Sequence, residues 1–149
     1  MDERERTLEL LRGLLARQRL GVLATHGESG PYASLVAFAA DADLTRLTFS
    51  TTRATRKYQL LSTEPRVAML IDSRSDDDLD FHKAVAVTAV GPVVELEGDE
   101  RDQALAEFVA RHPHLAGFAT APTTALLALD VETYYVVRRF QTVTELHMS

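Results

Sequence analysis

Two cations and a set of hydroxyl groups lie close together in the segment 47–71 of this sequence. Arg56 and Lys57 are adjacent, and the hydroxyl-bearing residues before them are Ser50, Thr51, Thr52 and Thr55. The pattern predicts a strand, a turn, a helix over 56–62 and a second strand. Because the first turn of a helix already concentrates partial positive charge, two cations there are unfavourable unless an anion is bound. The segment therefore predicts a phosphate site at the start of this helix.

Two other groups of ligand-type residues favour a structural interpretation. The run 73–80 holds four aspartates, but it lacks the glycine and terminal glutamate of a calcium loop, so we interpret it as a solvated loop. His112 and His114 flank Pro113, and no further ligands are evident for them, a pattern that favours a helix end. The sequence predicts no metal site.

The composition limits the classes of function. The chain has 149 residues, of which 46% are hydrophobic and 26% charged, and we expect one domain over 1–149. Cysteine is absent, which excludes disulfides, thiolate metal sites and cysteine nucleophiles and is compatible with a reducing cytoplasm, the location we expect. A formal net charge of −6 argues against a general affinity for nucleic acid or an anionic membrane.

The N-terminal segment reads as an amphipathic helix over 7–18, with leucines at helical spacing and Glu and Arg on the other side. It lacks the basic start and the uninterrupted apolar core of a signal peptide, and no stretch approaches the roughly 20 apolar residues of a membrane span. We expect this helix to lie on its own sheet or on a partner subunit.

Three strands in hairpin order are predicted before the cationic helix, over 20–25, 32–39 and 46–50. In the second of them, one face carries Tyr32, Ser34, Val36 and Phe38, and the other carries Ala33, Leu35, Ala37 and Ala39. The small second face suits the close approach of a planar group or another backbone, and it suits packing under a helix equally well.

The later elements complete a mainly β (α+β) fold. The near-continuous apolar run 67–71 predicts a central strand buried on both faces. A long strand over 84–98 follows, with a bulge or bend at Gly91–Pro92, and then a helix over 100–111 capped by Asp99. Further strands are predicted at 125–131, at 134–140 and in a last segment ending at Leu146. Six to seven strands in hairpin order with three helices indicate an antiparallel barrel with peripheral helices.

Three segments carry a family resemblance. The succession GPYASLVAF, LTFSTTRATRKYQLLSTEPRVAMLI and AVAVTAVGPVVEL resembles the pyridoxamine 5′-phosphate oxidase-related FMN-binding split-barrel family over about Leu20 to Leu96. The most specific part is Arg56-Lys57 followed by Glu64-Pro65-Arg66-Val67. The tail 108–140 is similar to the short haem-utilisation-like branch, with its His-Pro after the late helix and its Gly-Phe. The resemblance implies an antiparallel split barrel and a homodimer with FMN at the subunit interface.

The resemblance also implies roles for individual residues. Arg56 and Lys57 match the pair that clamps the FMN phosphate, and Ser50 and Thr51 match strand-end residues that reach the phosphate and ribityl chain. The segment that runs along the isoalloxazine ring and meets it through backbone groups is matched by Ser34, Leu35 and Val36. His82, at the start of the long strand, is a candidate for ring contact, and an ordinary loop end explains it equally well.

The chain also departs from the oxidase proper. That enzyme has an arginine at the position of Ser34, a lysine near Ala39 and a glutamine near Ala86. Its C-terminal arginine and histidine motif, which grips the substrate phosphate, has no match, because Arg138 and Arg139 stand in a different context. In the haem-utilisation branch this position tends to be Gly-Gly. We therefore do not expect a true pyridoxamine phosphate oxidase.

Three functions remain open on the sequence. The first is an FMN-dependent oxidoreductase of unassigned small-molecule substrate, in which the flavin carries the redox chemistry. The second is a haem-binding or haem-degrading protein of the same fold, which needs an iron ligand from His112, His114 or His147. The third is a non-catalytic flavin carrier. The sequence does not identify the electron donor or acceptor, nor whether a deazaflavin replaces FMN.

Overall fold

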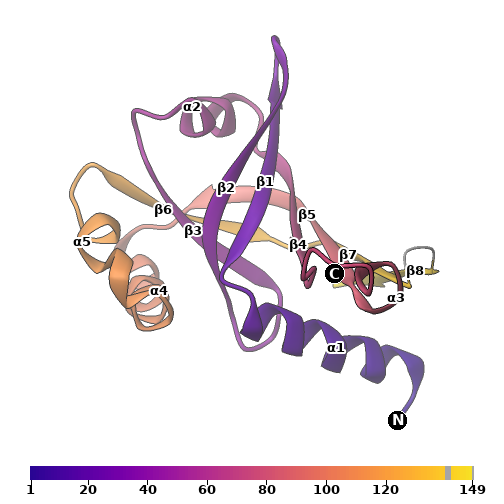
Figure 1. The fold of residues 1–149 in the computed structure, drawn as a ribbon. Helices are drawn as coiled ribbons and strands as arrows, with labels where there is room; N and C mark the ends of the chain where they lie inside the picture. Colours follow the sequence, from indigo (N-terminus) through magenta and orange to yellow (C-terminus); the bar gives the residue numbers. More distant parts are fainter. Residues whose placement is uncertain (140–141, 149) are drawn as a thin grey trace.

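The computed structural model describes residues 1–139 and 142–148, and it contains one extended antiparallel sheet with helices around it (Figure 1). The strands are β1 (Leu20–Gly27), β2 (Gly30–Ala40), β3 (Arg46–Thr52), β4 (Arg66–Asp72), β5 (Val85–Glu95), β6 (Thr124–Asp130), β7 (Thr133–Arg138) and β8 (Thr142–His147). The helices are α1 (Glu3–Arg17), α2 (Arg56–Thr63), α3 (Asp80–Lys83), α4 (Gly98–Arg111), α5 (Ala116–Ala119) and a 3₁₀ turn, η1 (Pro113–Leu115).

Six of the strands close into a barrel. Their order is β4-β1-β2-β3-β6-β5, and a further pairing between β4 and β5 completes the ring. Strands β7 and β8 continue the sheet from β5 beyond the barrel. The predicted mainly β antiparallel split barrel with peripheral helices is confirmed, although the described chain has eight strands where six to seven were predicted.

Strand β5 serves both the barrel and its extension because it changes partner at Gly91. Its first part pairs with β7 from Val85 to Val90, and its last three residues, from Val93 to Glu95, pair with β6. On the opposite edge β5 pairs with β4 as far as Pro92. A Cβ at Gly91 would lie 2.0 Å from the carbonyl oxygen of Asp130, so only glycine fits where the two strands cross. This is the bend predicted at Gly91–Pro92.

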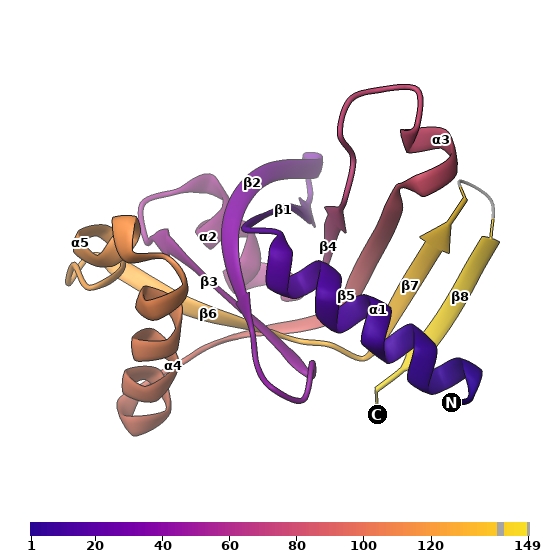
Figure 2. The ribbon, with the colours of Figure 1, turned by 60° about the horizontal axis from the view of Figure 1, so that its bottom comes forward.

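The hydrophobic core fills the barrel and continues beneath α1. Phe38, Phe49 and Tyr134 are among the largest fully buried side chains. Figure 2 shows α1 crossing one face of the sheet extension, and the leucines of α1 belong to the same buried cluster as Val136 and Leu146. The amphipathic helix predicted at 7–18 therefore covers its own sheet, although it begins earlier, at Glu3, with Asp2 as its cap.

The second face of β4 is not buried as the sequence predicts. Burial alternates along this strand, and Leu70 remains 38% exposed on the outer side. The strand is central, as predicted, because it pairs with both β1 and β5. On its outer side Leu70 borders a depression that is also lined by Phe81 of α3 and Thr88 of β5, and this apolar side chain remains partly in solvent. The prediction of burial on both faces is wrong for the isolated chain.

Several element boundaries also differ from the predictions. Glu97 takes the N-cap position of α4 and the helix begins at Gly98, whose φ of 62° suits glycine, so the predicted cap Asp99 lies in the first turn. The segment 81–83 forms part of the short helix α3 instead of a loop end, and α5 was not predicted. Strand β7 ends at Arg138, and the predicted strand end at Phe140 lies outside the described residues.

Substitution of Gly91 by alanine is expected to destabilise the protein by at least about 1–3 kcal/mol, because the new methyl group must displace the β6–β7 connection. Urea unfolding followed by circular dichroism measures this change. Gly117→Ala is the matched control, since no atom lies within 4 Å of the added Cβ in α5. Equal stability of Gly91→Ala and wild type would contradict this account of the bend.

Candidate functional site

Helix α2 begins with the two cations that the sequence singles out. The side chain of Thr55 caps the helix by accepting a hydrogen bond from the backbone N–H of Tyr58 at 3.3 Å. No acidic residue lies in the first turn. In the described chain, no acceptor is bonded to the backbone N–H of Arg56 or Lys57, so the helix start presents free donors beside two positive side chains.

The side chain of Arg56 contacts only neutral groups within the described chain. It donates a 2.7 Å hydrogen bond to the hydroxyl of Ser29, and its guanidinium lies 5.5 Å from the centre of the Tyr32 ring. Among the described residues, neither Arg56 nor Lys57 forms an ion pair with a carboxylate, although the chain carries 22 acidic residues. Figure 1 shows α2 beside the projecting β1–β2 hairpin, which supplies both contacts.

The predicted strand-end hydroxyls lie on opposite faces of β3. Thr51 is fully buried, and its hydroxyl lies 2.9 Å from the hydroxyl of Thr55. This hydrogen bond holds the side chain of Thr55, the N-cap residue of α2, in place. Ser50 points to the other side of the strand, in register with Leu126 of β6. Within this chain, the structure brings Thr51 close to the start of α2 and directs Ser50 away from it.

The predicted ring-binding segment Ser34–Val36 lies on a free edge of β2. Strand β2 pairs with β3 only over Phe38–Ala40, so the edge from Gly30 to Ala37 is unpaired on that side in the described chain, and this is the split in the barrel. The backbone N–H of Phe38 donates a hydrogen bond to the carbonyl oxygen of Arg19, on the β1 side. Because successive residues of a strand direct their backbone groups to opposite edges, the N–H and C=O of Leu35 face the open edge.

The three side chains of this segment have different surroundings. The hydroxyl of Ser34 is buried and has no hydrogen-bond partner in the described chain. It lies on the same face of β2 as Tyr32, the residue beneath Arg56. Val36 is buried in the core, and Leu35 is 64% exposed on the outer face. The unpartnered Ser34 oxygen, the open strand edge and the unpaired cations therefore belong to one region between β2, β3 and α2.

His82 does not join this region. It is exposed on α3 and lines a groove with Lys83, Arg138 and Arg139, and this groove contains none of the other predicted ligands. The sequence offered His82 as a candidate for ring contact, with an ordinary loop end as the equal alternative, and α3 lies at the end of the sheet extension where β5 begins (Figure 2).

Sequence reasoning missed a cluster that fixes the position of α2. Glu95, at the end of β5, forms an ion pair with Arg53 at 2.7 Å. Its carboxylate also accepts a 2.8 Å hydrogen bond from the hydroxyl of Tyr58. Partial burial disfavours the charged carboxylate, but the bonds from Arg53 and Tyr58 outweigh it and hold the pKa of Glu95 below its ordinary value. Glu95 lies 42 residues from Arg53 in the sequence, so no local pattern could have indicated this contact.

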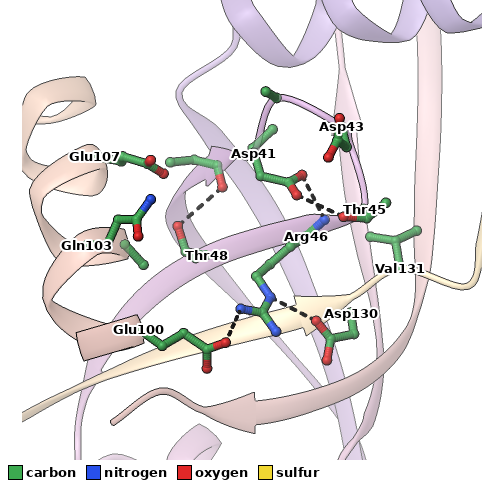
Figure 3. Close-up of a pocket in the computed structure, with 14 residues that line it drawn as sticks. Asp41, Asp43, Thr45, Arg46, Thr48, Glu100, Gln103, Glu107, Asp130 and Val131 are labelled. Atoms are coloured by element: carbon green, nitrogen blue, oxygen red, sulfur yellow. Dashed lines mark hydrogen bonds and ion pairs between the residues drawn. The ribbon is translucent and has the colours of Figure 1, made fainter. Parts of the chain in front are cut away.

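An acidic pocket lies elsewhere and is unsuited to a phosphate. It measures about 610 Å³ between α4 and the β2–β3 turn, and its lining includes five carboxylates: Asp41, Asp43, Glu100, Glu107 and Asp130. Figure 3 shows its single arginine, Arg46, paired with Glu100 at 3.3 Å and Asp130 at 2.9 Å. Burial opposes the charge of Arg46, but the two carboxylates raise its pKa overall. This pocket repels anions, and its ion pairs fasten α4 to β3 and β6.

The histidines proposed as iron ligands have different surroundings. His112 is buried, lies 2.6 Å from the carbonyl oxygen of Phe38 through Nε2, and packs against Phe108, so it serves to end α4. His147 lies 3.3 Å from Glu145 on the exposed side of β8, and His114 is exposed in η1. Among the residues that the structure describes, no group of three or more metal-binding side chains comes together. None of the described helices is long and apolar enough to cross a membrane.

Comparisons with known proteins agree with this architecture. Residues 7–138 match the family model described as Pyridoxamine 5′-phosphate oxidase. No curated protein sequence matches the chain.

Solved structures share the fold at low sequence identity. A haem-binding protein from Mycobacterium smegmatis is 20% identical with a TM-score of 0.81, over 91% of this chain and 55% of that one, so this chain spans about half of that protein. A protein from Clostridium acetobutylicum related to general stress protein 26 is 17% identical, with a TM-score of 0.73. The match covers 99% of this chain and 97% of that one. An FAD-binding protein from Mesorhizobium loti is 17% identical, with a TM-score of 0.69. The match covers 87% of this chain and 90% of that one. At these identities the likeness shows the fold.

The Glu95 cluster gives the stability of the fold a defined pH dependence. Because the folded-state pKa of Glu95 is lowered, its stabilisation is fully present above about pH 4.5 and is lost as the pH falls through the folded-state pKa. Glu95→Gln should reduce the free energy of unfolding at pH 7 by about 1 kcal/mol, and this difference from wild type should shrink below pH 4.5. Urea unfolding at several pH values measures it.

Glu97→Gln is the control for that experiment, because Glu97 is exposed and its side chain makes no capping bond. If the difference between Glu95→Gln and wild type persisted unchanged at pH 3, ionisation of Glu95 would not be its cause.

Proposed function

Because the chain belongs to the pyridoxamine 5′-phosphate oxidase family, we propose that it binds FMN and acts as an oxidoreductase on a small-molecule substrate. One observation carries this proposal: Arg56 and Lys57 form no ion pair with a described carboxylate, and they lie beside the open edge of β2. When bound, FMN would supply the hydride or electron transfer, and the protein would supply binding and orientation.

The phosphate of FMN fits the start of α2. A guanidinium, an ammonium and free backbone N–H groups there could all donate to it, and each charge-assisted bond is shorter and stronger than a neutral one. Arg56 would exchange the neutral Ser29 hydroxyl for an anion. Thr51 would act indirectly, by supporting the cap residue Thr55. The Glu95 cluster would hold α2 in place through Tyr58.

The isoalloxazine ring fits the free edge of β2. The backbone N–H and C=O of Leu35, which face the open edge, could satisfy polar atoms of the ring as an added strand would satisfy a sheet edge, whereas those of Ser34 and Val36 face β1. The buried, unpartnered hydroxyl of Ser34 provides a further group for the cofactor, because buried polar atoms are rarely left without a partner. Ser50 and His82 lie outside this region of one chain, so in the proposed site they could act only from the partner subunit.

A second copy of the chain fits the outer face of the sheet. One cross-strand row on this face runs from Leu35 through Val22, Leu70 and Thr88 to Tyr135. Alanines occupy much of the adjoining rows, at Ala24, Ala33, Ala68 and Ala86. Exposed apolar side chains on this face, such as Leu35 at 64% and Leu70 at 38%, are typical of a surface that a partner covers. We therefore propose a homodimer formed through this face, with FMN at the interface.

The phosphate site is tested with Arg56→Ala and Lys57→Ala. Each should weaken FMN binding about 10- to 100-fold, because a hydrogen bond to a charged group contributes about 1.5–3 kcal/mol and 1.4 kcal/mol is a factor of ten. Quenching of flavin fluorescence during titration measures the affinity. Binding of riboflavin, which lacks the phosphate, should not change in the same variants.

Arg17→Ala is the control, because Arg17 is exposed at the end of α1 and makes no ion pair in the described chain. Full FMN affinity in both variants would contradict the proposed phosphate site. A purified protein that gives a haem Soret band on titration, and no flavin spectrum, would contradict the FMN proposal as a whole. Bound FMN without turnover on any donor or acceptor would identify a flavin carrier.

The dimer is tested with Leu70→Glu. Light scattering after size exclusion should give twice the 16.5 kDa chain mass for wild type and the single mass for the variant, because the new carboxylate would be buried in the interface. The variant should also lose FMN affinity if the site is shared. Phe118→Glu is the matched control, since Phe118 is similarly exposed, at 42%, but lies on α5. A dimeric Leu70→Glu variant would rule out this face.

A further inference from the structure

A groove of about 420 Å³ lies where α3 meets the ends of β7 and β8. It is lined by His82, Lys83, Ala84, Val85, Arg138, Arg139 and Thr142. Three arginine and lysine side chains and one histidine therefore face a single depression, although the chain as a whole has a net charge of −6. None of the described residues that line the groove is a carboxylate.

Among the described residues, no carboxylate of the neighbouring acidic segment forms an ion pair with these cations. The carboxylate of Asp80 accepts the backbone N–H groups of Ser75 and Asp76, each at 2.8 Å, and Asp72 pairs with Arg74 at 2.8 Å. These carboxylates are thus bonded within their own loop. Within residues 1–139 and 142–148, no ion pair involves Lys83, Arg138 or Arg139.

Regular structure holds the cations in place. Arg138 is the cross-strand partner of both Val85 and Thr142, so it stands in a three-strand row. It is half-buried, and a partly desolvated guanidinium without a carboxylate is costly unless an anion accompanies it. The start of β5 is fixed by Ser73, whose hydroxyl accepts the N–H of Val85 at 2.9 Å.

Arg139 adds a second sign of function. It adopts a φ of 52°, in the left-handed region that favours glycine. Such strain in a non-glycine residue persists where the surrounding structure enforces it, and it concentrates at ligand sites. The strained position carries a cation that lines the same groove as Lys83 and Arg138.

From this arrangement we propose that the α3–β7–β8 groove is a second anion site, which binds a soluble small molecule through one or two phosphate groups. Guanidinium groups match phosphate oxygens in paired hydrogen bonds, and the volume lies within the range of small-molecule sites. The hydroxyl of Thr142 can add a further bond. Within one chain the groove is separate from the proposed phosphate site of FMN, because it contains neither α2 nor the β2 edge.

The test is calorimetric titration of the full chain with inorganic pyrophosphate at low salt, with and without FMN. Wild type should bind in both conditions, and Arg138→Gln/Arg139→Gln should weaken binding at least tenfold. Arg139→Gly should also weaken binding, while its melting temperature stays equal or rises because glycine suits the positive φ. That second variant separates a lost ligand contact from a lost fold.

Two controls complete the experiment. Arg17→Gln/Arg19→Gln removes the same charge from exposed positions and should change the affinity less than twofold. Arg56→Ala/Lys57→Ala should also leave pyrophosphate binding in the groove intact, whether or not FMN binds. The proposal is overturned if wild type shows no binding at millimolar pyrophosphate, or if the Arg56/Lys57 variant alone abolishes it. Binding only to phosphatidylglycerol vesicles would also overturn it, since the ligand would then be a lipid headgroup.

Discussion

Strand β5 changes partner at Gly91, and the remaining architecture depends on this one crossing. Before the glycine, β5 lies between β4 and β7 and builds the flat extension of the sheet. After it, the strand lies against β6 and completes the barrel. The carbonyl of Asp130 occupies the space of a side chain at Gly91, so the two halves can meet only where the chain has no Cβ.

The split forms because β2 pairs with β3 over a short length only. Beyond Phe38 the two strands diverge, and β2 keeps hydrogen bonds with β1 alone. A free edge inside a closed barrel is unfavourable unless a partner covers it. Helix α2 stands at this opening with its cations unpaired, and the Glu95 cluster fixes its position from the end of β5. The unpaired backbone groups of β2 and the cations of α2 thus lie at the same opening, and this arrangement is the basis of the FMN proposal.

Charge is segregated over the molecule despite the acidic excess. The acidic pocket beside α4 gathers carboxylates around Arg46, which is already paired, whereas α2 and the α3–β7–β8 groove hold cations that form no ion pair among the described residues. An ion pair at an exposed cation such as Arg56 or Lys83 contributes little to stability, so leaving these two unpaired costs the fold little, whereas the half-buried Arg138 is stabilised by an accompanying anion. The outer face leaves apolar side chains of β4 in solvent, where a second subunit could cover them, just as the unpaired cations are available to a ligand.

The sequence by itself determined the order of the strands and of the helices α1, α2 and α4, the bend at Gly91, and the amphipathic helix that covers the sheet. It also singled out Arg56 and Lys57, because hydrophobic periodicity, turn residues and charge at a helix start are local properties. Only the tertiary structure decided that Thr51 and Ser50 face opposite ways in one chain, that Ser34 lacks a partner, and that His82 lies with Arg138. The exposure of β4 likewise reflects which elements cover it. These outcomes depend on contacts between segments far apart in the chain, and no local pattern of residue types specifies such contacts.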